Sequence, residues 1–158
     1  MVATVQGATL WHEGQFDGWR VHVPVLLGRR PVEPDDDELR AFHLRLIEAA
    51  GEVRRGDWAV CDATGWPDNA TWFQLLAWSW TDSDRRALVV VNYAAHAASA
   101  MVQPGWPDMA GRTWRLDDLL TGDTYERDGD DMRANGLFVA LPPWGAHVFA
   151  CTPLGEPG

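Results

Sequence analysis

Short apolar runs separated by turn-forming residues fill the chain from residue 57 onward. Eight segments there have the length and composition of β-strands: residues 57–61, 71–80, 86–93, 97–103, 113–116, 124–127, 136–141 and 146–151. The run Leu88-Val89-Val90-Val91 indicates a central strand buried on both faces. Asp128-Gly129 predicts a hairpin turn, because both positions tolerate positive φ. Since no helical pattern separates these strands, the region predicts an antiparallel β-sandwich.

The first third of the chain follows a different pattern. Residues 8–11 are apolar and predict a short buried strand, and the polar, glycine-rich residues 12–18 predict a loop after it. Residues 21–27 are apolar but contain Pro24, which favours an extended, irregular path. The pattern then changes to helical spacing, so one helix should close this segment.

The expected helix has a polar start and one apolar side. Residues 35–38 are all acidic, and acidic side chains suit the free N–H groups and positive dipole end of a helix N-terminus. This capping role explains them better than a metal or catalytic site does. The apolar side is formed by Leu39, Phe42, Leu46, Ile47 and Ala50. Gly51 is predicted to end the helix, and His43 to pack beside the apolar side.

These patterns divide the chain into parts with different expected structures. The predicted fold class is mainly β: an antiparallel β-sandwich preceded by one short strand, a long loop and one helix. Residues 1–55 form a βα segment, residues 56–153 form the sandwich, and residues 154–158 form a frayed tail.

Composition narrows the choice of partners and location. The net charge of −10 and the pI of about 4.7 argue against nucleic acid as a partner, because an acidic surface repels phosphates. No signal peptide and no membrane-spanning run are visible, so we expect a cytoplasmic protein without a membrane partner. Cys61 and Cys151 are expected to be buried thiols. Neither a zinc-ligand spacing nor a cofactor motif is recognisable, so no metal and no cofactor are expected.

Tryptophan is the unusual residue type, with ten copies in 158 residues. Exposed indole rings stack on the C–H faces of sugars, so the excess suggests a carbohydrate ligand. Packing in a core or between domains is the alternative, because each buried indole removes about 150–250 Å² from water. Trp144, between Pro143 and Gly145, fits either a surface platform or a plug between domains. Asn92, at the end of a predicted strand, is expected to satisfy backbone groups rather than bind sugar.

Residues 7–34, GATLWHEGQFDGWRVHVPVLLGRRPVEP, resemble the last barrel strand and loop of the α-amylase superfamily, glycoside hydrolase family thirteen. Gly7 and the Gly14-Gln15 pair carry this similarity, although Thr9 stands where proline is usual and Phe16 where glutamate is common. The later segments ALVVVNYA, TWRLDDLLTGDTYERDG and GLFVALPPWGAHVF resemble the C-terminal β-sandwich of the same family. These segments occur in the same order as in the family, and the resemblance covers nearly the whole chain.

The resemblance implies a C-terminal region of an α-amylase-like glycosidase or glucosyltransferase that acts on an α-glucan or maltooligosaccharide. Such enzymes use two carboxyl groups and retain anomeric configuration. Those groups lie on earlier barrel strands, so no residue of this chain is assigned a catalytic role, and the chain alone is expected to be inactive. Four loop residues are candidates for sugar contacts in a complete enzyme: Trp11, His12, Glu13 and Gln15. Bracing of this loop against the sandwich is an equal alternative.

Two other functions fit the same residues. A stand-alone carbohydrate-binding module predicts exposed, coplanar tryptophans. A small hydrolase predicts a pocket with two close carboxyl groups, but Asp117-Asp118 and Asp130-Asp131 are sequence neighbours whose side chains should diverge. The C-terminal-region hypothesis predicts a bare apolar surface on residues 8–11 and the helix, with self-association through it as one outcome.

Overall fold

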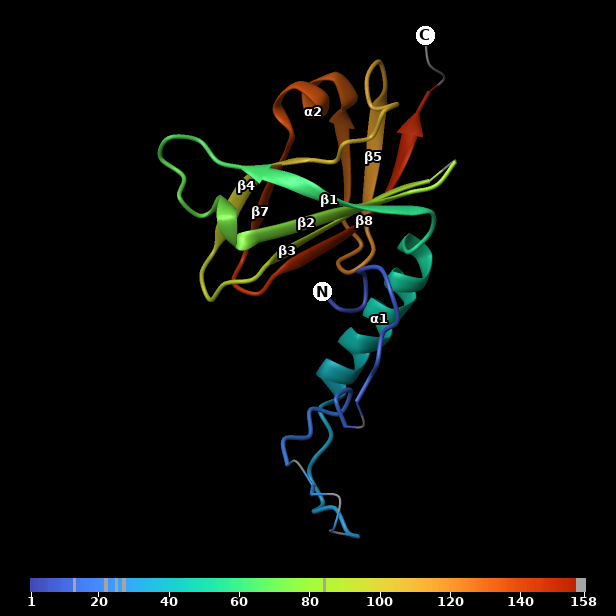
Figure 1. Ribbon diagram of the computed structural model, residues 1–158, viewed down its shortest axis with the longest axis vertical. Helices are drawn as coiled ribbons and strands as arrows, with labels where there is room; N and C mark the ends of the chain where they lie inside the picture. Colours follow the sequence, from blue (N-terminus) through green and yellow to red (C-terminus); the bar gives the residue numbers. More distant parts are fainter. Residues whose placement is uncertain (13, 22, 25, 27, 84, 156–158) are drawn as a thin grey trace.

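The computed structural model describes residues 1–12, 14–21, 23–24, 26, 28–83 and 85–155 (Figure 1). Its helical elements are α1 (Asp37–Val53), the 3₁₀ turn η1 (Trp72–Gln74) and α2 (Gly129–Asn135). Its strands are β1 (Asp57–Thr64), β2 (Leu75–Thr81), β3 (Arg86–Asn92), β4 (Ala98–Gln103), β5 (Thr113–Asp118), β6 (Thr124–Asp128), β7 (Leu137–Leu141) and β8 (Ala146–Leu154). The predicted strands from residue 57 onward are therefore present, except that Trp72–Gln74 of the predicted strand 71–80 form the 3₁₀ turn η1 and β2 begins only at Leu75.

The strands form one curled antiparallel sheet in the order β6-β5-β8-β3-β2-β1-β4-β7. The sheet turns at β1, whose residues 57–61 pair with β2 while residues 62–64 pair with β4. Strands β4 and β7 thereby fold over the rest of the sheet, and apolar side chains fill the space between the two layers. The predicted sandwich architecture is confirmed.

The core between the layers is built by strict alternation along the strands. Leu88 and Val90 of β3 point inward to meet Trp114 and Leu116 of β5 and Val102 of β4, and none of these side chains is more than 1% exposed. The run at residues 88–91 is buried on both faces as expected, because Val89 packs on the opposite side of the sheet.

Both cysteines lie in this core as free thiols, which confirms the prediction made for them. Burial raises the pKa of the Cys61 thiol to about 11 and raises that of Cys151 as well. Both side chains are therefore protonated near neutral pH and behave as small apolar groups.

Helix α1 begins as predicted but is longer and differently packed. Asp36 caps it, since its Oδ1 accepts the Leu39 N–H at 2.9 Å. The prediction that Gly51 ends the helix is wrong, because α1 continues to Val53 and the Arg54 N–H bonds to the Ala50 carbonyl. Figure 1 shows α1 leading away from the sandwich toward the loop that precedes it. Neither helix of the described residues is long and apolar enough to cross a membrane.

The N-terminal segment differs from the expectation. The short strand predicted at residues 8–11 is wrong: the described part of residues 1–36 contains no strand, and Leu10 is 91% exposed. Apolar composition alone cannot make a strand, because its backbone groups need a neighbouring strand to bond with. Ala3, Thr4 and Gly14 are the buried residues in the described part of this segment.

The prediction of a hairpin turn at Asp128-Gly129 is also wrong. Asp128 instead caps α2, with its Oδ1 accepting the Asp131 N–H at 2.9 Å. Gly129 is needed for close packing, since a Cβ there would lie 1.8 Å from the Met109 carbonyl oxygen. At the other end, β8 includes Leu154, which belonged to the predicted frayed tail, and residues 156–158 lie outside the described part.

Candidate functional site

The outer face of the sheet, which points away from the sandwich core, is covered over only part of its width. A row of side chains crosses it, because Val60 pairs with Trp78, Trp78 with Val89, and Val89 with Val148. Ala49 and Val53 of α1 pack against the buried residues of this row, which are Trp78, Val89 and Val148. Trp78 is only 4% exposed, whereas its neighbour Val60 is 71% exposed. The covering layer therefore stops between β2 and β1.

The N-terminal segment forms the edge of the covering layer. The indole N–H groups of Trp78 and Trp80 both donate to the Thr4 carbonyl, at 2.9 and 2.8 Å. These side chains are two residues apart on β2 and thus point to the same face. The shared acceptor fixes Thr4 on the sheet and leaves Met1 and Val5 beside the uncovered part.

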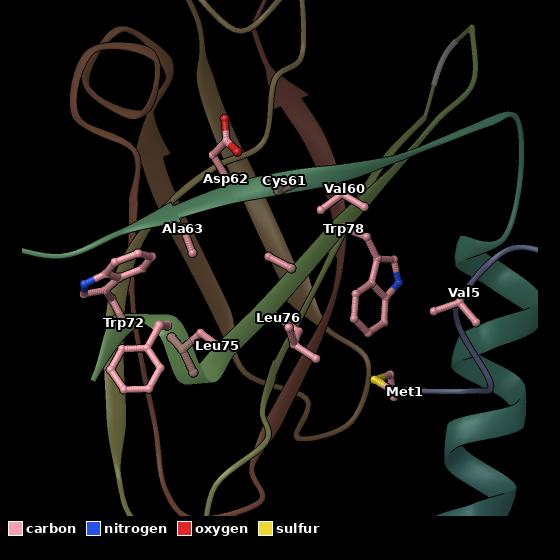
Figure 2. A pocket seen from close by; sticks show the side chains of 12 residues that line it. Met1, Val5, Val60, Cys61, Asp62, Ala63, Trp72, Leu75, Leu76 and Trp78 are labelled. Carbon is pink, nitrogen blue, oxygen red and sulfur yellow. The ribbon is translucent and has the colours of Figure 1, made fainter. Parts of the chain in front are cut away.

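Beyond this edge lies an open apolar groove of about 370 Å³ (Figure 2). We call it the docking groove. Its lining includes Met1, Val5, Val60, Asp62, Ala63, Trp72, Phe73 and Leu76. Asp62 is a charged residue of the lining, and in Figure 2 its side chain leaves β1 on the side away from β2, the strand that carries Leu76. Phe73 is 63% exposed, so a large apolar ring of this groove is open to solvent.

Helix α1 carries a second bare surface. Phe42, Leu44 and Ile47 are exposed, and Phe42 and Ile47 belong to the side predicted to be apolar. His43 is buried as expected, with its Nδ1 at 2.9 Å from the Leu39 carbonyl. The C-terminal-region hypothesis predicted a bare helix surface of this kind.

The predicted sugar-contact residues lie in the loop before α1. Trp11 packs against Phe16 and His43, with ring centroids 5.4 and 5.8 Å apart. Gln15 folds back within the loop, where its Oε1 accepts the backbone N–H of the exposed His12 at 3.3 Å. Glu13 lies outside the described residues. These contacts brace the loop, and a role of any of the four in sugar binding stays a prediction.

Among the residues that the structure describes, Asp118 at the end of β5 is the most buried carboxylate. Its oxygens accept from His147 Nδ1 at 2.6 Å, from the Leu120 and Val148 N–H groups, and from the Thr121 hydroxyl. Burial alone raises the pKa of Asp118, but the hydrogen bonds from His147 and the two backbone groups outweigh it and hold the pKa below its usual value. A carboxyl group held in its charged form does not suit a general acid, whose pKa must be raised.

The adjacent acidic pairs have structural partners. Asp117 bonds to Arg115 and Thr124, and in α2 Asp130 accepts the Gly111 N–H while Asp131 accepts from the Asn135 side chain. Among the residues that the structure describes, no group of three or more His, Cys, Asp or Glu side chains could hold a metal ion.

A second candidate site is an exposed pair of aromatic rings, which we call the aromatic corner: Tyr93, after β3, and Trp144, before β8. They are 65% and 63% exposed, and their ring centroids lie 5.9 Å apart with planes at 89°. Trp144 has φ of +57°, the only positive φ at a residue other than glycine in the described chain. This conformation costs an L-residue roughly 1–2 kcal/mol. Sequence patterns single out Trp144 but give no signal for Tyr93.

Comparison with known proteins gives similarity only at the level of structure. No protein-family model matches the chain, and no curated protein sequence matches it. Among solved structures, a maltogenic α-amylase, AmyB, from Thermotoga neapolitana matches 98% of this chain with a TM-score of 0.67 and 13% identity. An α-amylase from Anoxybacillus matches 77% of it with a TM-score of 0.53 and 16% identity.

The match covers a minor part of each of these structures. This chain corresponds to 35% of the Thermotoga chain and 24% of the Anoxybacillus chain. At these identities the similarity shows the fold alone, which this chain shares with part of each of these two α-amylases.

Proposed function

We propose that this chain is the C-terminal region of an α-amylase-like glycosidase or glucosyltransferase, where it supports the catalytic barrel. The observation that carries the proposal is the half-covered outer face, where Trp78 is buried under the N-terminal segment and Val60 beside it is exposed. The catalytic carboxyl groups would lie on the barrel, and the substrate would be an α-glucan or maltooligosaccharide. The cytoplasmic location stays a prediction.

The chemistry of the docking groove supports a protein occupant. Val60, Ala63 and Leu76 are aliphatic and lie along two adjacent strands, β1 and β2. Aliphatic side chains pack well against the apolar side of a helix or strand but offer no hydrogen bonds to sugar hydroxyls. The groove is continuous with the contact that already exists between the N-terminal segment and the sheet, so a barrel would extend this contact.

A stand-alone carbohydrate-binding module is the alternative. It requires several indole rings in one plane, but the three exposed tryptophans each pair with a different ring: Trp66 with Phe138, Trp72 with Phe73, and Trp144 with Tyr93. This distribution favours the support role over a flat sugar-binding platform.

The test is to identify the polypeptide that carries this sequence in its source cells. An antiserum raised against the isolated chain should deplete an extract of activity on maltoheptaose, and the depleted polypeptide should yield barrel peptides in mass spectrometry. The isolated chain should not turn over maltoheptaose. Turnover by the isolated chain, or a depleted polypeptide without barrel peptides, would overturn the proposal.

Glutamate substitutions at Val60 and Leu76 test whether the docking groove serves contacts rather than folding. In the isolated chain we expect the double variant Val60→Glu, Leu76→Glu to associate less at high concentration and to bind less of an apolar dye. Its free energy of unfolding should change by no more than about 1 kcal/mol, because both side chains are already exposed. Sedimentation velocity and chemical denaturation measure the two effects.

The matched control is Val32→Glu, which replaces a fully exposed valine in the loop before α1. This variant should leave self-association unchanged. An equal effect of the Val32 and groove substitutions would show that general hydrophobicity, and not the groove, drives association.

A further inference from the structure

We propose that the aromatic corner, Tyr93 with Trp144, binds an α-glucan chain as a second carbohydrate site, separate from the docking groove and the barrel. The choice of an α-linked glucose polymer rests on the proposed function. The site itself rests on three observations about the isolated chain: strained backbone at an exposed ring, a buried side chain that fixes both turns, and ring planes at right angles.

The backbone at Trp144 is strained, and the ring that it carries packs edge-to-face against the ring of Tyr93. A residue at positive φ is usually glycine or asparagine, which tolerate this conformation. Trp144 instead places a large ring there, and most of the ring remains in contact with solvent. Strain of this kind persists where surrounding structure enforces it and is concentrated at functional sites. A ligand that stacks on the exposed ring would explain why the chain tolerates the conformational free energy of a positive φ at Trp144.

Asn92 enforces the geometry of the corner. Its side chain is fully buried, and its Nδ2 donates to the carbonyls of His96, Leu141 and Pro142. Its backbone N–H also donates to the Gly145 carbonyl at 2.9 Å. These bonds join the turn between β3 and β4 to the turn between β7 and β8, so one side chain ties together the two turns that carry the rings. A site fixed before binding loses less entropy when its ligand arrives.

The arrangement of the rings fits a sugar better than a flat protein surface. A pyranose ring has an apolar C–H face that stacks on an indole, while its hydroxyl rim needs polar partners. The perpendicular Tyr93 ring closes one side of the corner and carries a phenolic hydroxyl that both donates and accepts hydrogen bonds. Successive glucose units of a bent α-linked chain present faces at an angle, which two perpendicular rings can contact together.

The corner is distinct from the docking groove in composition and position. Neither Tyr93 nor Trp144 lines the groove, whose lining combines aliphatic side chains with the aromatic rings of Trp72, Phe73 and Trp78. The backbone N–H of Trp144 bonds to the Ala94 carbonyl at 3.0 Å, so the corner is built by the two turns and not by the sheet face that a barrel would cover. Both sites can therefore be occupied at once.

The experiment is a calorimetric and NMR titration of the isolated chain with maltoheptaose, with cellohexaose as the β-linked comparison. We expect weak binding of maltoheptaose, and amide shifts confined to the two turns. Trp144→Gly should weaken binding by about tenfold or more, and Tyr93→Ala should weaken it as well. Trp144→Gly should not lower the melting temperature, because glycine removes the strain at this position.

Trp66→Ala is the matched control, since Trp66 is another exposed indole that contacts an aromatic ring. It should leave maltoheptaose binding unchanged. Lack of binding to the unaltered chain, an equal loss in Trp66→Ala, or a clear drop in melting temperature in Trp144→Gly would overturn the aromatic corner as a glucan site. Binding that disappears in the intact enzyme would show that another part of the enzyme covers the corner, and would overturn it too.

These outcomes separate the two proposals. Glucan binding at the corner together with an antiserum target that lacks a barrel would leave the corner standing and remove the support role. An antiserum target that contains a barrel, together with a corner that does not bind glucan, would leave the support role standing and remove the glucan site.

Discussion

Replacing Asp118 by alanine should lower the free energy of unfolding by about 3–5 kcal/mol, because the substitution leaves several buried donors without an acceptor. The Asp118 side chain is fully buried and holds His147, the turn after β5 and the start of β8 together. The methyl side chain of alanine has no oxygen that could accept these hydrogen bonds. Urea denaturation, followed by tryptophan fluorescence, measures the loss.

Asp117→Ala is the control, because it removes a neighbouring carboxylate whose partners, Arg115 and Thr124, lie at the surface. We expect this variant to lose no more than about 1 kcal/mol. Losses of similar size in the two variants would contradict the special role of the buried network.

The same residue should determine part of the acid sensitivity of the chain. Hydrogen bonds hold the pKa of Asp118 in the folded state below the ordinary value of 3.8. The stability that this carboxylate contributes is therefore fully present above pH 3.8 and is lost as the pH falls from there through the lowered pKa. Asp118→Asn should flatten this part of the stability profile, and an unchanged acid slope would contradict the prediction.

The strands of the sandwich were predictable from the sequence because alternation and turn residues are local signals. The β3 run at residues 88–91 identifies a strand buried on both faces by its composition alone. The capping of α1 by Asp36 is also local, since donor and acceptor lie three residues apart. The sequence could not show that β1 divides its partners between β2 and β4, because pairing depends on how distant strands meet.

The errors have a common cause in contacts between distant segments. Residues 8–11 are apolar enough for a strand, but no neighbouring strand supplies their hydrogen bonds. Asp128-Gly129 fits a hairpin turn equally well as a helix start, and the close approach of Gly129 to Met109 goes with the helix.

The candidate sites were only partly visible in the sequence. Asn92 was correctly expected to satisfy backbone groups, but its carbonyl partners Leu141 and Pro142 lie 49 and 50 residues away and could not be identified. Trp144 was recognised as a candidate platform, and its positive φ and its pairing with Tyr93 are evident only in three dimensions. The docking groove was not predicted: the sequence led us to expect a bare apolar surface on residues 8–11 and the helix, whereas the groove lies mainly on β1 and β2.

Phenylalanine at both Trp78 and Trp80 should release the N-terminal segment from the sheet and lower the free energy of unfolding by about 3–5 kcal/mol. The double variant leaves the buried Thr4 carbonyl without its two donors, which costs about 1–3 kcal/mol. The smaller rings also leave cavities beneath α1, which account for the rest. Hydrogen exchange should become faster in residues 1–5 and in the last turns of α1, while the inner core stays protected.

Trp106→Phe separates the lost hydrogen bonds from the lost volume. Trp106 is also buried, but its indole nitrogen has no hydrogen-bond partner, so the substitution removes bulk without removing a bond. We expect it to cost about 1 kcal/mol and to leave exchange in residues 1–5 unchanged. If the double variant kept slow exchange in the N-terminal segment, the Thr4 contact would not be what holds that segment on the sheet. The edge of the docking groove would then have to be fixed by apolar packing of Val5 and α1 alone, and the support role would rest on a weaker attachment between the segment and the sandwich.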